Sequence, residues 1–210
     1  MLTNHFQEVN MSDNLVITIG REHGSGGRYV GEKLAEKLGI KCYNSELVTE
    51  TALKSGFSEN FIADNEEKKP ESLLFSIAMA YSVSGSQPVT MRLFNEQTKV
   101  IKELAQRESC IIIGRAADYI LREHKNLLRV FLCAPLEDRI SRICKTDKLS
   151  PNEAEKIIRK KDKQRAAFIS FYSDRKWGLA SNYDLCINTA LFGIDGSVEL
   201  LEKCAQSKMK

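Results

Sequence analysis

A short run near the start of the chain holds residue types that bind phosphate groups. It is rich in glycine and ends in a positive charge. Its residues are His23, Gly24, Ser25, Gly26, Gly27 and Arg28. Glycine has no Cβ, so its backbone reaches positive φ angles and approaches a ligand closely. At the start of a helix, such a loop turns its N–H groups toward an anion. The sequence therefore predicts a phosphate-binding loop.

The flanking residues place this loop between a strand and a helix. Residues 15–19 are apolar and mostly β-branched, as in a buried parallel strand, and apolar residues recur at helical spacing over 30–38. The loop departs from the pattern Gly-x-x-x-x-Gly-Lys-Ser/Thr, because Gly27 stands where that pattern has lysine. Arg28, one position later, is the candidate replacement. The alternative is a glycine-rich turn that binds no ligand.

Cations later in the chain are candidates for neutralising phosphate charge, which is most of what phosphoryl transfer requires. Arg115 directly follows an apolar strand, and an arginine there suits bidentate contact with phosphate or carboxylate. Its alternative role is a surface ion pair. Arg139 and Arg142 lie on the helix after the fourth predicted strand.

The basic stretch after residue 150 contains a further candidate, Arg165. Most charge-rich helices present a solvated face, which is the alternative here. However, Asp162, Arg165, Ile169 and Tyr172 are spaced three, four and three residues apart, so they share one face. An acid and a base on the same side as apolar residues indicate a face that is directed inward.

Strands and helices alternate along the chain, which predicts an α/β fold with a five-stranded parallel sheet and helices on both faces. The predicted strands are residues 15–19, 40–43, 110–113, 128–134 and 183–187. Ligands bind beyond the carboxyl ends of such strands. The residues that follow those ends include the glycine loop, Asn44, Ser45 and Arg115. A single domain is predicted over residues 14–204, after a loose leader at 1–13.

Two segments depart from simple alternation. Residues 57–109 form helices and loops between the second and third strands, a connection too long for a simple crossover, so we expect a helical insert over the site. Ser150, Pro151 and Glu153 form a capping box with proline at the first helical position. The helix that they begin is predicted to run to about residue 172.

Composition excludes several classes of protein. The 210 residues are 42% hydrophobic and 28% charged with a net charge of +3, which is ordinary for a globular domain and too small to indicate nucleic acid binding. No signal peptide or membrane span is evident, and the six cysteines form no C-x-x-C pair. A cytoplasmic protein with cysteines that serve packing is expected. No metal-ligand spacing is present, so no metal-binding residues are predicted.

At this point the chain resembles the cytidylate kinase-like family of P-loop nucleoside monophosphate kinases. The resemblance rests on motifs in consistent order from about residue 14 to 204. They are residues 17–28, 43–47, 113–115, 162–165 and 183–189. The chain departs from the family at Gly27, where the loop lysine is missing, and at Asn44, which lacks an expected charge. Ile113 and Ala116 replace the acids that flank the family's Gly-Arg.

The resemblance implies a kinase fold with an acceptor-binding helical insert and a lid over about residues 139–176. The loop from residue 23 to 28 would hold the phosphates of ATP. The residues implied as catalytic are Arg28, Arg139, Arg142 and Arg165. Those implied to face the acceptor are Asn44, Ser45, Arg115, Asp162 and Arg165. Mg²⁺ would be held mainly by nucleotide phosphates and water.

The function expected from these features is ATP-dependent phosphoryl transfer to a nucleoside monophosphate, with CMP and dCMP first. One alternative is a kinase for another small phosphorylated or hydroxylated metabolite. Another is a regulatory protein that binds nucleotide without catalysis, which the missing lysine would suit. Neither nucleic acid nor a membrane is expected as a partner: no aromatic residues interleave the basic cluster as in nucleic-acid binders. The resemblance leaves a homodimer open.

Overall fold

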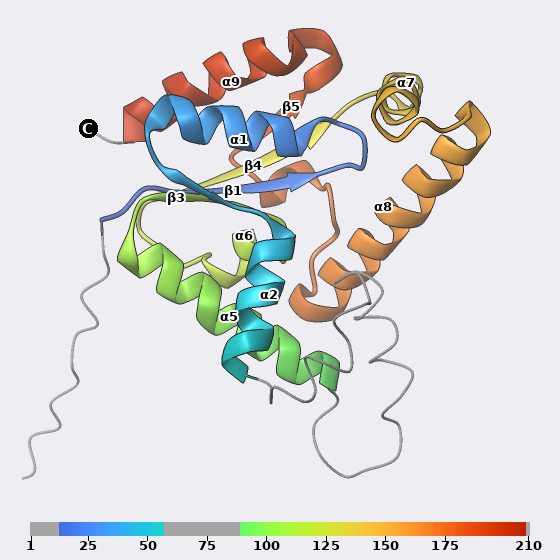
Figure 1. The fold of residues 1–210 in the computed structure, drawn as a ribbon. Coiled ribbons are helices and arrows are strands. Elements are labelled where there is room, and N and C mark those ends of the chain that lie inside the picture. The colour runs from blue at the N-terminus through green and yellow to red at the C-terminus, as the bar shows by residue number, and fades with distance from the viewer. Residues whose placement is uncertain (1–12, 57–88, 209–210) are drawn as a thin grey trace, which may run out of the picture.

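A computed structural model describes residues 13–56 and 89–208 of the chain. At its centre is a parallel sheet in the order β2–β3–β1–β4–β5 (Figure 1). The strands are β1 (Val16–Arg21), β2 (Lys41–Tyr43), β3 (Cys110–Ile113), β4 (Leu127–Cys133) and β5 (Leu185–Asn188). Val16 lies opposite Cys110 on one side and Leu127 on the other. The predicted α/β fold with five parallel strands is therefore confirmed.

Helices cover both faces of the sheet, as Figure 1 shows. On one face lie α1 (Gly27–Leu38) and α9 (Thr189–Lys208); on the other lie α2 (Ser45–Gly56), α5 (Val89–Arg107) and the short α6 (Ala117–Ile120). Alternate residues of β1 enter separate cores: Ile17 and Ile19 pack with α1 and α9, whereas Val16 packs with α2 and α5. Strands buried on both faces need the continuous apolar runs seen in the sequence.

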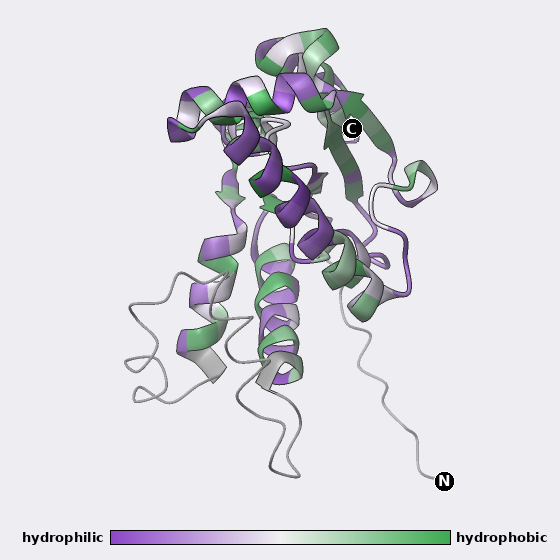
Figure 2. Cartoon of the chain, turned by 90° about the vertical axis from the view of Figure 1, so that its right-hand side faces the viewer, coloured by the Kyte–Doolittle hydropathy of each residue, from purple (hydrophilic) through white to green (hydrophobic). Residues whose placement is uncertain are grey.

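Two helices lie beyond the carboxyl ends of the strands, α7 (Leu136–Asp147) and α8 (Pro151–Ser173) (Figure 1). They share a small core around Ile143, Ala154 and Ile158, separate from the cores beside the sheet. The predicted capping box is present at the start of α8. Figure 2 shows α8 as largely hydrophilic along its first part and more hydrophobic toward its end. That end is the part that lies over the carboxyl edge of the sheet.

Some predicted boundaries differ from the structure. The last helix begins at Thr189, before the turn predicted at 193–196, and bends at Gly193, whose φ is 67°. Cys186, predicted to serve packing, is exposed on β5, because β5 is an edge strand. A one-turn 3-10 helix, η1 (Ala180–Asn182), precedes β5.

Several predictions lie wholly or partly outside the described residues. Residues 1–12 and 57–88 are not described, which includes most of the predicted leader and much of the predicted insert. The boundaries of the domain, insert and lid stay predictions. Within 13–56 and 89–208, no helix is long and apolar enough to cross a membrane.

Candidate functional site

The glycine loop connects β1 to α1 and has the backbone geometry of an anion cradle. Gly24 and Gly26 both have φ near +81°, a conformation that side chains disfavour. Space requires glycine as well: a Cβ added at Gly26 would lie 2.4 Å from Cδ1 of Ile194, and one at Gly24 would lie 3.0 Å from the carbonyl oxygen of Arg139. The glycines therefore allow α7 and α9 to approach the loop backbone.

Several backbone N–H groups of this loop have no protein acceptor. Among the described residues, the N–H groups of Gly24, Gly26 and Gly27 donate no hydrogen bond. They precede or begin α1, where the partial positive charge of the helix end favours an anion. The start of α9 holds the loop in place, because the Thr189 hydroxyl donates to the Ser25 carbonyl over 2.6 Å. This geometry fits phosphate oxygens.

An ion-pair network joins the loop to α7 and α8. Arg139 is largely buried and donates to Asp162 over 2.5 Å, while its Nε lies 3.5 Å from Glu22. The other carboxylate oxygen of Asp162 accepts the backbone N–H of His23 over 2.7 Å. An aspartate from α8 thus occupies a loop N–H that a phosphate oxygen also suits. Arg139 further donates to the His23 carbonyl.

His23 itself is not a cation at neutral pH. Burial, with the nearby charge of Arg165, lowers the pKa of its imidazole to about 4. Its contribution to the loop is therefore the backbone, whose N–H and C=O both form the hydrogen bonds described above.

The two remaining loop cations differ in position. Arg142 of α7 donates a short hydrogen bond to the Gly24 carbonyl, so its guanidinium lies at the loop. The side chain of Arg28 is 62% exposed and pairs with Glu32 one turn along α1, at 2.8 Å. The structure therefore places Arg139 and Arg142 of α7 at the loop, while the side chain of Arg28 lies on the outer side of the start of α1.

Beside the loop, a cavity of about 570 Å³ opens between the carboxyl edge of the sheet and the second half of α8. Its walls combine aromatic rings with charged groups. The rings belong to Phe168, Phe171, Tyr172, Trp177 and Tyr183. The charged and polar lining consists of Arg21, Ser45, Arg115, Asp118, Lys161, Gln164 and Arg165. A planar molecule with an anionic group fits this lining.

Three arginines from three elements converge on this cavity. Arg21 ends β1, Arg115 follows β3 and Arg165 lies on α8. Burial lowers the pKa of Arg21 to about 9, and the positive charges of Arg165 and Arg115 add to this effect. Burial likewise lowers the pKa of Arg115 to about 10, with Arg165 contributing. Guanidinium groups stay charged at neutral pH. The lowered pKa values therefore mean that the surroundings disfavour these positive charges, and that a bound anion would stabilise them.

The turn that carries Arg115 is strained. Gly114, Arg115 and Ala116 have successive φ values of 81°, 55° and 53°. Non-glycine residues adopt this region at a cost, which proteins tolerate mostly where function requires a particular geometry. Here the turn directs Arg115 toward the cavity, where its guanidinium lies 5.8 Å from the centre of the Phe168 ring.

Asn44 and Ser45, which were both predicted to face the acceptor, make different contacts. The Asn44 side chain accepts the Leu47 N–H over 2.8 Å, which caps α2. Ser45 lines the cavity, where its hydroxyl accepts from Arg21 and its carbonyl accepts from Arg115, each at 3.4 Å. Asp162 does not line the cavity; it binds the loop instead.

Sequence reasoning did not identify three features of this site: Arg21, Asp118 and the aromatic wall. Arg21 could have been found by the argument used for Arg115, since each follows an apolar run after one glycine. Asp118 is 8% exposed, and burial raises the pKa of its carboxyl group. Its sequence context gives no sign of this, because α6 is too short for a periodic pattern.

The described residues offer phosphates a cradle but offer Mg²⁺ no dedicated ligand set. No group of three acidic, histidine or cysteine side chains gathers within 13–56 and 89–208. The acids nearest the loop, Glu22 and Asp162, pair with Arg139. A divalent cation at this site would be held by nucleotide phosphates and water.

Comparisons with known sequences identify the family of this chain. The family model described as the cytidylate kinase-like family matches residues 16–191. The cytidylate kinase of Ignicoccus hospitalis is 27% identical over 190 residues, which cover 90% of this chain and 97% of that enzyme. The cytidylate kinase of Archaeoglobus fulgidus is 29% identical over 198 residues, with coverage of 91% and 95%.

Solved structures show the same fold. An uncharacterized protein from Eubacterium ventriosum superposes with a TM-score of 0.70 at 26% identity, covering 92% of this chain and 99% of that one. Shikimate kinase from Bacteroides thetaiotaomicron superposes with a TM-score of 0.54 at 15% identity, covering 91% and 98%. At that identity the likeness concerns the fold alone.

Proposed function

Because this chain belongs to the cytidylate kinase-like family, we propose that it transfers the γ-phosphoryl group of ATP to a nucleoside monophosphate, CMP or dCMP first. One observation carries the proposal: a phosphate loop with free N–H groups lies beside an arginine-lined aromatic cavity, and Arg21 belongs to both. Two adjacent anion sites are what in-line transfer between two phosphates requires.

On the donor side, the loop from His23 to Arg28 binds the ATP phosphates through backbone N–H groups. Arg139 and Arg142 approach this loop and neutralise negative charge as it develops. Asp162 leaves the His23 N–H when a phosphate oxygen binds there. Mg²⁺ supplies further neutralisation of the donor phosphates when bound.

On the acceptor side, Arg115 and Arg165 hold the monophosphate group, and Ser45 supports Arg115. An oxygen of the acceptor phosphate attacks the γ-phosphorus in line, and ADP leaves. That oxygen carries no proton to remove when the acceptor is dianionic, so no protein base is needed. Asn44 shapes this wall by capping α2, and Asp162 contributes through its contact with the loop.

The aromatic wall and Asp118 suit a cytosine base. The rings offer stacking surfaces, which every base can use. The Asp118 carboxylate is a hydrogen-bond acceptor, which matches the exocyclic amino group of cytosine and opposes the carbonyl of uracil. CMP should therefore be preferred to UMP.

The helices α7 and α8, within the proposed lid at about 139–176, move as a unit on their own small core and exclude water when closed. The insert predicted at 57–109 is proposed to bind the acceptor as well.

The deciding experiment offers ATP and Mg²⁺ with CMP, dCMP, UMP, AMP or GMP and follows both the phosphorylated acceptor and ADP. Stoichiometric transfer to CMP or dCMP is expected. ADP release with none of the five phosphorylated indicates hydrolysis or another acceptor. ATP binding without any transfer contradicts the proposal and favours a regulatory role.

Replacing Arg28 tests whether it substitutes for the missing lysine. A surface pair such as Arg28–Glu32 contributes only about 0.3–0.5 kcal/mol, so Arg28 can leave Glu32 for a bound phosphate at little cost. Arg28→Ala is expected to lower kcat about 10²-fold, the scale for removal of one preorganised charged group. Glu32→Gln breaks the same pair but keeps the cation, so its kcat should stay near that of the wild type. Equal kcat in all three proteins would assign Arg28 to the surface pair alone.

A further inference from the structure

Arg21 occupies an unusual place at the boundary between the two halves of the site. Its backbone begins the phosphate loop, where the phosphate-loop pattern has its first glycine. Its side chain leaves the loop and lies against the end of β3, where its guanidinium is close to Gly114, a position whose φ of 81° favours glycine. From there it reaches the cavity and donates to Ser45 over 3.4 Å.

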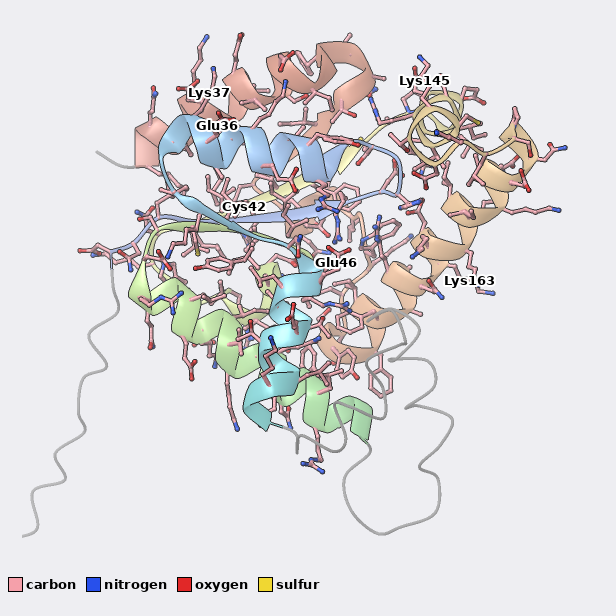
Figure 3. All side chains as sticks on the ribbon, in the orientation of Figure 1. Glu36, Lys37, Cys42, Glu46, Lys145 and Lys163 are labelled. Atoms are coloured by element: carbon pink, nitrogen blue, oxygen red, sulfur yellow. The ribbon has the colours of Figure 1, made fainter. Side chains whose placement is uncertain are left out.

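The surroundings of Arg21 lack the partner that a structural arginine normally has. Among the described residues, no carboxylate lies within 4.0 Å of its guanidinium. The attraction of Glu46 and Asp162 is outweighed by burial and by the charges of Arg165 and Arg115. Figure 3 shows Glu46 at the start of α2, on the side of the helix that faces the carboxyl edge of the sheet.

A structural arginine in the same protein provides a contrast. Arg129 on β4 is also partly buried, but it forms two hydrogen bonds from its side chain to Asp184, at 2.6 and 3.2 Å. Its charge is compensated within the fold. In the cluster of Arg21, Arg115 and Arg165, by contrast, the one carboxylate within 4.0 Å among the described residues is Asp162, which lies 3.7 Å from Arg165 and also pairs with Arg139. An anion in the cavity would therefore stabilise this cluster of three cations.

We infer that Arg21 is a binding residue for the acceptor, and supplies the third guanidinium around its oxyanion together with Arg115 and Arg165. This inference rests on the proposed function for the identity of the acceptor, and it commits the cavity to a ligand that carries a phosphoryl or carboxylate group. Since the Arg21 carbonyl also accepts from Arg165 over 3.0 Å, acceptor binding and loop position are linked through one residue.

The test compares Arg21→Met, Arg21→Lys and Arg129→Met with the wild type, all as the full chain. Thermal unfolding is measured without ligand and with CMP, cytidine, inorganic phosphate, benzoate or ATP. Cytidine lacks the phosphate, and benzoate offers a carboxylate on a ring. Arg129→Met is the matched control for loss of a partly buried but paired arginine.

Removal of Arg21 is expected to raise the unfolding temperature of the ligand-free protein by about 2–4 °C, because it relieves repulsion within the cluster. Arg129→Met should lower it. In Arg21→Met, stabilisation by CMP should be lost while stabilisation by ATP persists, and the acceptor KM should rise about 10- to 100-fold, the scale for one charge-assisted hydrogen bond. Arg21→Lys should recover part of the acceptor affinity.

The outcomes separate this inference from the proposed function. If CMP stabilises the wild type but not Arg21→Met, Arg21 binds the acceptor even when no phosphoryl transfer occurs. If benzoate is the only ligand that stabilises the wild type but not Arg21→Met, the ligand is a carboxylate, and the assignment of a monophosphate acceptor fails. The inference is overturned if Arg21→Met lowers the unfolding temperature and keeps its response to CMP, if it loses ATP and CMP binding equally, or if no anion stabilises the wild type.

Discussion

Replacing Arg165 with alanine is expected to lower kcat/KM for the acceptor by about 10²- to 10³-fold, the loss typical when one preorganised charged donor leaves a reaction site. Arg165 lines the cavity that we propose for the acceptor and donates to the Arg21 carbonyl over 3.0 Å, so it joins this cavity to the end of β1, which leads into the loop. Its guanidinium is largely buried, which lowers its pKa. Because water is largely excluded there, the charge is screened less than a surface charge. Steady-state kinetics with varied CMP at saturating ATP measures the effect.

The matched control is Lys163→Ala, which removes a cation two residues away on the same helix. Lys163 is exposed and is not among the residues that line the cavity, and Figure 3 shows its side chain directed away from the sheet. Its loss should change kcat/KM less than about twofold, as expected for a screened surface charge. Similar losses in the two variants would mean that α8 acts through its overall charge, and the specific role of Arg165 would be rejected.

The second large effect concerns stability. Arg139→Met should lower the free energy of unfolding by about 3 kcal/mol, because it leaves partly buried Glu22 without its counterion and leaves Asp162 with only the longer contact to Arg165, at 3.7 Å. Asp162, with 16% of its side chain exposed, and Glu22, with 24%, both face Arg139. Urea unfolding, with the slope compared between variants, measures the loss.

A double variant identifies the cause. Asp162→Asn removes one of the two carboxylate charges that lose Arg139 as a partner in Arg139→Met. The double variant should therefore be more stable than the sum of the single losses predicts. Lys145→Met serves as the control on the same helix, since Lys145 is exposed and labelled at α7 in Figure 3. Additive losses would show that Arg139 stabilises the protein by packing rather than by pairing with Asp162.

Together these variants address how α7 and α8 control the loop. Arg139 of α7 and Asp162 of α8 bind each other and both bind the His23 backbone. A phosphate at the His23 N–H must compete with Asp162. Under the proposed function, binding of the donor is therefore linked to the position of the two helices through this pair.

Much of the fold was predictable from short-range pattern. Apolar, β-branched runs such as Val16–Ile19 and Cys110–Ile113 predicted the strands, because a parallel sheet covered on both faces admits few polar residues. The capping box at Ser150 predicted where α8 begins. The predictions were less accurate at Gly193. In the sequence, a glycine that bends a helix cannot be distinguished from a glycine in a turn before the helix.

The sequence by itself determined the five strands, the alternation of strands and helices, and the glycine loop between β1 and α1, because each is encoded by residues close together in the chain. It also placed Arg115 at the carboxyl edge and predicted that Arg165 lies on an inward-directed helix face. Only the tertiary structure decided that Asp162 binds the His23 backbone, 139 residues away, and that Arg21 turns into the acceptor cavity. Both depend on how α8 packs over the loop, and side-chain direction at such a contact is set by space and charge across the fold.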